Sequence, residues 1–115
     1  MAVFVSVRGW IEANDEQMSL IKFAILNCNN SVKSYQSAWL FSTAGGNSNF
    51  AFFGCTIREQ MVEDMRSFLE TLAIISSVDG EFTDYPIAVF HLKHEDESVL
   101  DIVWKFAEGK FVELS

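Results

Sequence analysis

The sequence predicts an α+β domain in which an antiparallel sheet carries two helices on one face. Half of the 115 residues are hydrophobic, which suffices for a core in a chain of this length. Several segments alternate apolar and polar residues, as strands do, whereas residues 57–75 repeat their apolar residues at the helical period. We expect residues 1–115 to form a single domain, since domains commonly have about this length.

The N-terminal half predicts a strand, a helix and a hairpin. Asn14 or Asp15 can cap the helix, because a short polar side chain there accepts a bond from a free backbone N–H, and Gln17 stands three residues after Asn14. The expected segments are a strand at 4–11, a helix from about Glu16 to the polar run 27–30, a strand at 35–43, a glycine-rich turn at 44–48 and a strand at 50–56.

The C-terminal half predicts a second helix and three strands. Thr56 and Glu59 have the spacing of a capping box at the start of the helix 57–75. The segments that follow are a loop at 76–84, a strand at 87–92, a turn at 95–98, a strand at 100–106, a tight turn at Glu108-Gly109 and a strand at 110–114. The order β-α-β-β-α-β is the ferredoxin-like order, here extended by a C-terminal hairpin.

Composition excludes several classes of protein. Sixteen acidic residues against eight basic ones give a net charge of −8, and we expect no nucleic-acid partner because phosphate binding needs clustered Lys and Arg. The many apolar residues exclude a disordered chain. No segment approaches the ~20 apolar residues of a membrane span, and the N-terminus lacks a signal-peptide pattern, so we expect no membrane partner and a cytoplasmic location. Cys28 and Cys55 are expected as buried free thiols.

No motif predicts catalysis. His91 and His94 stand three apart on an expected strand and so point to opposite faces, which does not suit a shared metal. The segment around Asp79 and Glu81 resembles a calcium loop in part, but Asp84 stands where the glycine should be and a strand replaces the exit helix. We expect no metal, no cofactor and no enzymatic activity.

Three aromatic residues crowd one expected strand. Phe50, Phe52 and Phe53 cannot all point to the same side, so either both faces of the strand are covered or some of the rings are exposed. The sequence is consistent with two roles for these rings, packing in the core or forming part of a protein interface. RNA-binding sheets display aromatic residues, but basic residues do not flank these rings in the sequence, and the negative charge opposes phosphate.

The acidic residues concentrate in the last third of the chain. Residues 76–115 hold nine acidic and three basic residues, so six of the eight net negative charges lie there. Candidate partner-binding residues form two acidic groups with aromatic anchors; they are Asp79, Glu81, Phe82, Asp84, Tyr85, Glu95, Asp96, Glu97 and Asp101. Complementary charge speeds association and an aromatic side chain supplies binding energy, which predicts one face that docks a basic protein. Plain solubility is the alternative explanation.

The acidic loop 79–85 and the strand pair around 104–110 give the chain a character that resembles bacterial immunity proteins. These proteins neutralise toxins of contact-dependent growth inhibition, colicin and other polymorphic-toxin systems. The resemblance implies a small cytoplasmic protein that binds a cognate basic toxin, often a nuclease, in a one-to-one complex and covers its active site. The resemblance concerns the overall character of the whole chain and rests on no specific motif. It therefore assigns no role to any single residue.

Two other hypotheses stay open. A ferredoxin-like sheet can bind a small ligand or carry an enzyme, which a polar pocket or saturable ligand binding would favour. An acidic chain can also mimic DNA and block a DNA-binding protein, which requires carboxylates spaced like phosphates along one elongated face. The oligomeric state is not determined by the sequence.

Overall fold

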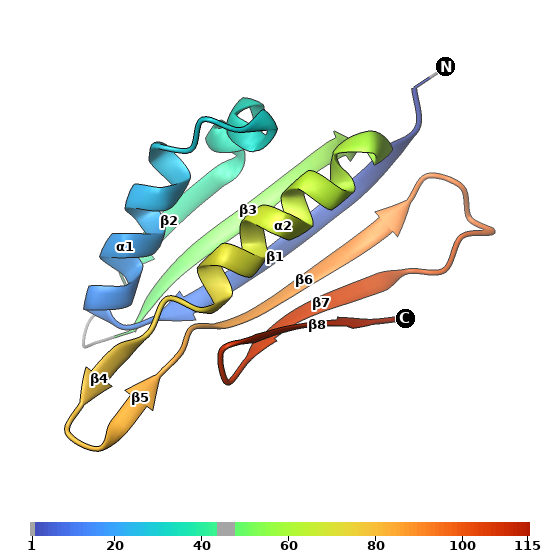
Figure 1. Cartoon of the computed structure of the whole chain (residues 1–115). Helices are drawn as coiled ribbons and strands as arrows, with labels where there is room; N and C mark the ends of the chain where they lie inside the picture. The colour runs from blue at the N-terminus through green and yellow to red at the C-terminus, as the bar shows by residue number, and fades with distance from the viewer. Residues whose placement is uncertain (1, 44–47) are drawn as a thin grey trace.

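The computed structural model describes residues 2–43 and 48–115 of the chain (Figure 1). The described residues form two α-helices, two 3-10 helices and eight strands. In chain order they are β1 (Phe4–Ala13), α1 (Asp15–Leu26), η1 (Ser31–Ala38), β2 (Trp39–Thr43), β3 (Asn49–Arg58), η2 (Glu59–Met61), α2 (Val62–Ala73), β4 (Ser77–Asp79), β5 (Phe82–Asp84), β6 (Ile87–His94), β7 (Ile102–Ala107) and β8 (Lys110–Leu114).

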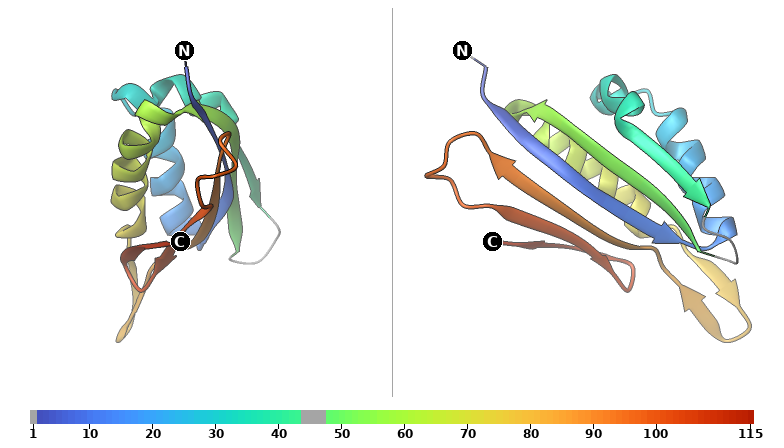
Figure 2. Two further views of the ribbon diagram at one scale, coloured as in Figure 1. Left: turned by 90° about the vertical axis from the view of Figure 1, so that its right-hand side faces the viewer. Right: turned by 180° about the vertical axis from the view of Figure 1, so that it is seen from behind.

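Six strands form one sheet in the order β2-β3-β1-β6-β7-β8, and every neighbouring pair is antiparallel. Both α-helices lie on the same face of this sheet, and within residues 2–43 and 48–115 no helix lies on the opposite face (Figure 2). The predicted α+β class, the antiparallel sheet and the placement of the helices are therefore confirmed. Strands β4 and β5 form a separate two-stranded sheet.

The core lies between the helices and the sheet. Alternate residues of β1 point to it, so Val7 and Ile11 are fully buried while Arg8 between them is exposed. The apolar stripe of α2 that the sequence predicts is buried as well, with Met65, Phe68 and Leu72 facing the core. Burying these side chains stabilises the fold by about 1.5–3 kcal/mol each. Within the described residues, no helix is long and apolar enough to span a membrane.

Helix α1 begins as predicted. The side chain of Asn14 accepts a hydrogen bond from the backbone N–H of Gln17 at 2.9 Å, and the Gln17 side chain accepts one from the backbone N–H of Asn14 at 3.0 Å. This reciprocal pair is a capping box that satisfies two of the free N–H groups at the helix start.

The start of α2 differs from the prediction. Thr56 is not a helix cap, because β3 continues to Arg58, which pairs with Phe4 at the start of β1. The backbone N–H of Glu59 then bonds to the carbonyl oxygen of Val3 at 2.8 Å. Long-range pairing with β1 thus holds the backbone extended where the local sequence favours a helix, and the short helix η2 delays the start of α2 until Val62.

The strand predicted at 35–43 is also shorter than expected. Residues Ser31–Ala38 form the 3-10 helix η1, which Asn30 caps by accepting a hydrogen bond from the N–H of Val32 at 3.2 Å. The side chain of Gln36 donates to the carbonyl oxygen of Ile25 at 2.9 Å and ties this helix to the end of α1. The predicted glycine-rich turn at 44–48 falls mostly on residues 44–47, which lie outside the described residues.

Candidate functional site

A short hairpin made by β4 and β5 projects beyond one end of the large sheet (Figures 1 and 2). The sequence predicts a loop here, but Ser77 pairs with Asp84 and Asp79 with Phe82 in an antiparallel ladder. The tip needs Gly80, whose φ of +63° lies in the left-handed region that other residues rarely adopt. The segment predicted as a loop at 76–84 is therefore two short strands joined by a glycine turn.

Two carboxylates of this hairpin, those of Asp79 and Asp84, flank an exposed aromatic ring. Residues directly paired across an antiparallel ladder point to the same face, and so do residues two apart on one strand. Asp79 and Asp84 therefore share a face with Phe82, whose side chain is 76% exposed. Glu81 stands at the tip. Within the part of the chain that the structure describes, the side chains of Asp79, Glu81 and Asp84 show no hydrogen bond or ion pair.

The base of the hairpin is fixed by the capping box of α1. The amide nitrogen of Asn14 donates to the hydroxyl oxygen of Ser77 at 2.6 Å. The amide nitrogen of Gln17, a residue only 2% exposed, donates to the backbone carbonyl oxygens of Asp84 at 2.8 Å and Ile75 at 3.4 Å. The same two side chains that start the helix therefore orient the hairpin against it.

An acidic hollow of about 330 Å³ lies between the hairpin and the start of α1. Four carboxylates line it, and their residues are Asp15, Glu16, Asp79 and Asp84. Asp15 accepts a hydrogen bond from the side chain of Asn49 at 2.7 Å, which holds it in place at the helix N-terminus. Four negative charges around one concavity suit a basic side chain of a partner.

The side chain of Tyr85 is less exposed to solvent than that of Phe82. Its ring lies over Gly109 in the turn between β7 and β8, so closely that a β-carbon on Gly109 would meet the ring at 2.8 Å. Glu108 and Gly109 both have positive φ, +54° and +76°, which is the geometry of a type I′ hairpin turn and confirms the tight turn predicted there. Tyr85 is 38% exposed and serves mainly to fix the end of β5 to this turn.

The second acidic group lies in the loop between β6 and β7 and uses most of its carboxylates internally. The backbone N–H of Phe4 donates to Glu95 Oε1 at 3.1 Å. Asp101 Oδ2 contacts His91 Nε2 at 3.1 Å. Asp96 accepts hydrogen bonds from the hydroxyl and the backbone N–H of Ser98, and these bonds lower the pKa of its carboxyl. In the described residues, Glu97 alone of this group shows no such contact.

The structure does not bring the two acidic groups together. The hairpin precedes β6 and the β6–β7 loop comes after it, so the two groups are separated by the length of this strand. Its eight residues span roughly 25 Å. Figure 1 shows the hairpin and the β6–β7 loop at opposite ends of the molecule. The prediction that they form one docking face is therefore wrong, because an extended strand separates two segments that lie close in the sequence.

Comparison of the chain with protein-family models, with curated proteins and with solved structures finds no match. The candidate site is accordingly interpreted from its own geometry.

The two histidines lie on opposite faces of β6, as predicted. His91 pairs with Arg8 on the open face, and His94 pairs with Val5, which faces the core. His94 Nδ1 accepts a hydrogen bond from the N–H of Asp96 at 2.9 Å, which leaves Nε2 as the nitrogen that pairs with Glu59. Among the described residues, no group of three or more His, Cys, Asp and Glu side chains could hold a metal ion. Cys28 and Cys55 are free and half-buried, and burial raises the pKa of the Cys55 thiol.

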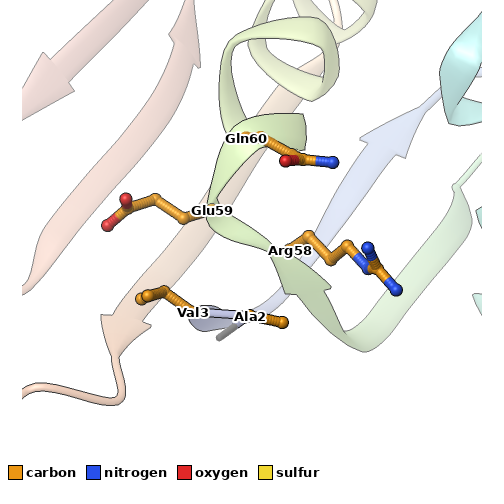
Figure 3. Close-up of a pocket in the computed structure, with 5 residues that line it drawn as sticks. All are labelled: Ala2, Val3, Arg58, Glu59 and Gln60. Atoms are coloured by element: carbon orange, nitrogen blue, oxygen red, sulfur yellow. The ribbon is translucent and has the colours of Figure 1, made fainter.

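A larger hollow of about 480 Å³ lies where β3 ends (Figure 3), at the opposite end of the molecule from the hairpin (Figure 1). Arg58 and Glu59 line it, and Figure 3 shows their side chains pointing to opposite sides of the ribbon. Glu59 turns toward His94, with which it pairs. Because the charges diverge instead of converging on the hollow, the β4–β5 hairpin is the better candidate site.

Proposed function

We propose that this chain is a binding protein that docks a basic protein partner through the β4–β5 hairpin. The observation that carries the proposal is the exposed ring of Phe82 between the carboxylates of Asp79 and Asp84. An exposed aromatic side chain loses water over a large area on binding, and such residues commonly supply most of the binding energy of an interface. Uncompensated carboxylates beside it attract a basic surface over a distance and speed its association.

The rigid base of the hairpin adds to the affinity that such a site can reach. Ordering a flexible loop on binding costs free energy, and that cost falls when the bound shape already exists in the free protein. The bonds from Asn14 and Gln17 hold the hairpin before any partner arrives. The adjoining acidic hollow offers space for a Lys or Arg side chain of the partner.

We further propose that the partner is a toxin domain and that the chain acts as a non-catalytic immunity protein in the cytoplasm. A basic active-site cleft, such as that of a nuclease, has the charge that the hairpin complements. Inserting Phe82 and its neighbouring carboxylates into the cleft would exclude the nucleic-acid substrate. The sequence resemblance to immunity proteins in size, charge and class supports this interpretation.

A second proposal concerns the type of fold. We infer that β1, α1, β2, β3, α2 and β6 together form a ferredoxin-like unit, because the strand order β2-β3-β1-β6 with antiparallel neighbours and both helices on one face is that of the split β-α-β arrangement. The β4–β5 hairpin is then an insertion between its last helix and last strand, and β7–β8 an extension of its sheet.

The test is growth rescue and binding with a candidate toxin domain, chosen as the one encoded beside the gene of this chain. We expect the wild type to restore growth and to bind the toxin domain with a rate that falls as salt increases. The variant Asp79→Lys/Asp84→Lys should slow association by about tenfold or more, and Phe82→Ala should speed dissociation, since truncating an anchor residue commonly costs about 2 kcal/mol or more.

Glu97→Lys is the matched control. It reverses an exposed carboxylate at the other end of the molecule, so binding should be unchanged apart from a small effect of net charge. If the control slows association as much as a single reversal in the hairpin does, the charge acts through the whole molecule and the hairpin is not the docking site.

A further inference from the structure

The open face of the sheet carries aromatic residues that the sequence alone could not place. Strand register sets Trp10 of β1 between Phe52 of β3 and Val89 of β6, with Leu40 of β2 beyond Phe52. The ring of Phe50 is nearly parallel to that of Phe52, at 13° with centroids 5.7 Å apart, and lies 6.3 Å from that of Trp10. Phe52 is 43% exposed. We call Trp10, Phe50 and Phe52 the aromatic patch.

Basic side chains share the open face with this patch, and Arg8 and Lys105 are the two that the register places nearest to Trp10. The alternation that turns Trp10 to the open face also turns five of the chain's eight Lys and Arg residues to it. They are Arg8, Arg58, Lys93, Lys105 and Lys110. Among the described strand residues only Glu12 places a carboxylate on this face, and loop residues Glu95, Glu97 and Asp101 stand at its rim beside Lys93 and His91. On its strands this face therefore carries five basic residues and one carboxylate, Glu12, which is paired with Phe50, in a chain of net charge −8.

We propose that this open face binds single-stranded nucleic acid. Unpaired bases stack on exposed aromatic rings, and Arg and Lys side chains beside those rings neutralise the phosphates. Trp10 and Phe52 are central in the sheet, Arg8 lies next to Trp10 along β1, and Lys105 lies two strands away on the same row. The patch lies on the surface of a sheet, where bases can stack on side chains without requiring a groove.

A second copy of this chain fits the face less well. Two such faces brought together would oppose their own Arg and Lys residues, with one strand carboxylate from each copy to compensate, and like charges at an interface are costly. An acidic protein would match the charge, but it does not need aromatic rings among the basic residues. Nucleic acid uses both features.

The net negative charge does not prevent this binding at ordinary salt. Charges separated by more than about 8 Å of water are largely screened at physiological ionic strength. The β4–β5 hairpin, which carries three acidic residues, extends beyond the end of the sheet, and helix α2, which carries three more, lies on the opposite face (Figure 2). The sequence-based exclusion of nucleic acid relied on total charge and on neighbours along the chain, whereas register collects the basic residues from five strands.

The experiment is fluorescence anisotropy with labelled oligo-dT and oligo-U of about 12 nucleotides at about 50 mM salt. We expect the wild type to bind, and Phe50→Ala/Phe52→Ala to weaken binding by at least about tenfold through lost stacking. The matched control is Phe23→Ala, which removes a ring that is 67% exposed on α1 and should leave binding unchanged. Circular dichroism confirms that each variant is folded.

Charge is tested separately. Arg8→Glu/Lys105→Glu should abolish binding or reduce the slope of log affinity against log salt by about 1.4, the value for two phosphate contacts on a single strand. Lys22→Glu/Lys33→Glu, which reverses two charges on the helical side, should change the slope little.

Absence of oligonucleotide binding by the wild type overturns the proposal, and so does an equal loss in the control variants. A dimer that Phe50→Ala/Phe52→Ala dissociates, or equal competition by polyglutamate, would also overturn it by assigning the face to a protein.

Discussion

The two acidic segments of this protein look alike in sequence but are built in opposite ways. The β4–β5 hairpin holds its position through amides and backbone groups at its base, and leaves the carboxylates of Asp79 and Asp84 free. The β6–β7 loop holds its position through its own carboxylates, with Glu95 bonded to the N–H of Phe4 and Asp101 to His91. A carboxylate that already has a partner inside the fold adds less to binding, so similar composition does not imply similar function.

The largest effect is expected where the hairpin is anchored. Gln17→Ala removes a buried amide that serves both α1 and the hairpin, and leaves the carbonyl oxygen of Asp84 without its donor. The free energy of unfolding should fall by about 2–3 kcal/mol, the cost of a lost cap together with a partly buried unsatisfied group. Urea unfolding measures this loss. Gln60→Ala on the surface is the control, and an equally small change for both would show that the hairpin does not depend on Gln17.

A smaller effect is expected in the β6–β7 loop. Glu95→Ala removes an acceptor from the N–H of Phe4 and should lower the free energy of unfolding by about 1 kcal/mol. Glu97→Ala should change it by less than about 0.5 kcal/mol, because that side chain has no contact to lose. The pair of variants, measured together by thermal unfolding, separates structural carboxylates from free ones. Equal stabilities would contradict the role assigned to Glu95.

The pH dependence of the loop follows from Asp96. The hydrogen bonds from Ser98 lower the pKa of Asp96 below its ordinary value of 3.8, so the ionised group stabilises the fold above that value. This contribution is lost as the pH falls through the lowered pKa. The destabilisation caused by Asp96→Asn should therefore shrink in acid. Carboxyl NMR titration should also show the pKa of Asp96 rising in Ser98→Ala, and an unchanged pKa would contradict this cause.

The smallest effect on stability is expected from neutralising the hairpin. The variant Asp79→Asn/Glu81→Gln/Asp84→Asn should change the free energy of unfolding by no more than about 0.5 kcal/mol, since no bond inside the fold is lost. Removing mutual repulsion among these carboxylates should even stabilise the protein slightly at low salt. Chemical denaturation at two salt concentrations checks this. A loss above 1 kcal/mol, roughly one internal hydrogen bond, would show that the hairpin carboxylates are structural after all.

Local patterns predicted most of the elements. The capping residues Asn14 and Gln17 located the start of α1, and the apolar spacing of Met65, Phe68 and Leu72 identified the buried face of α2. Both signals act within a few residues, which is why they can be read from the chain alone. The errors at Thr56 and Tyr35 occurred where distant groups decide the conformation. β1 extends the strand through Thr56, and the bond from Gln36 to Ile25 holds the helical turn around Tyr35.

The sequence by itself determined the class of the fold and the acidic character of residues 76–115. It also identified Phe82 as a candidate partner-binding residue. Only the tertiary structure decided how the charges are sorted. It set the two acidic groups at opposite ends of β6, and it gathered Arg8 and Lys105 beside the aromatic patch. The physical reason is that strand register joins residues far apart in the chain and assigns each to one of two faces, which local composition does not specify.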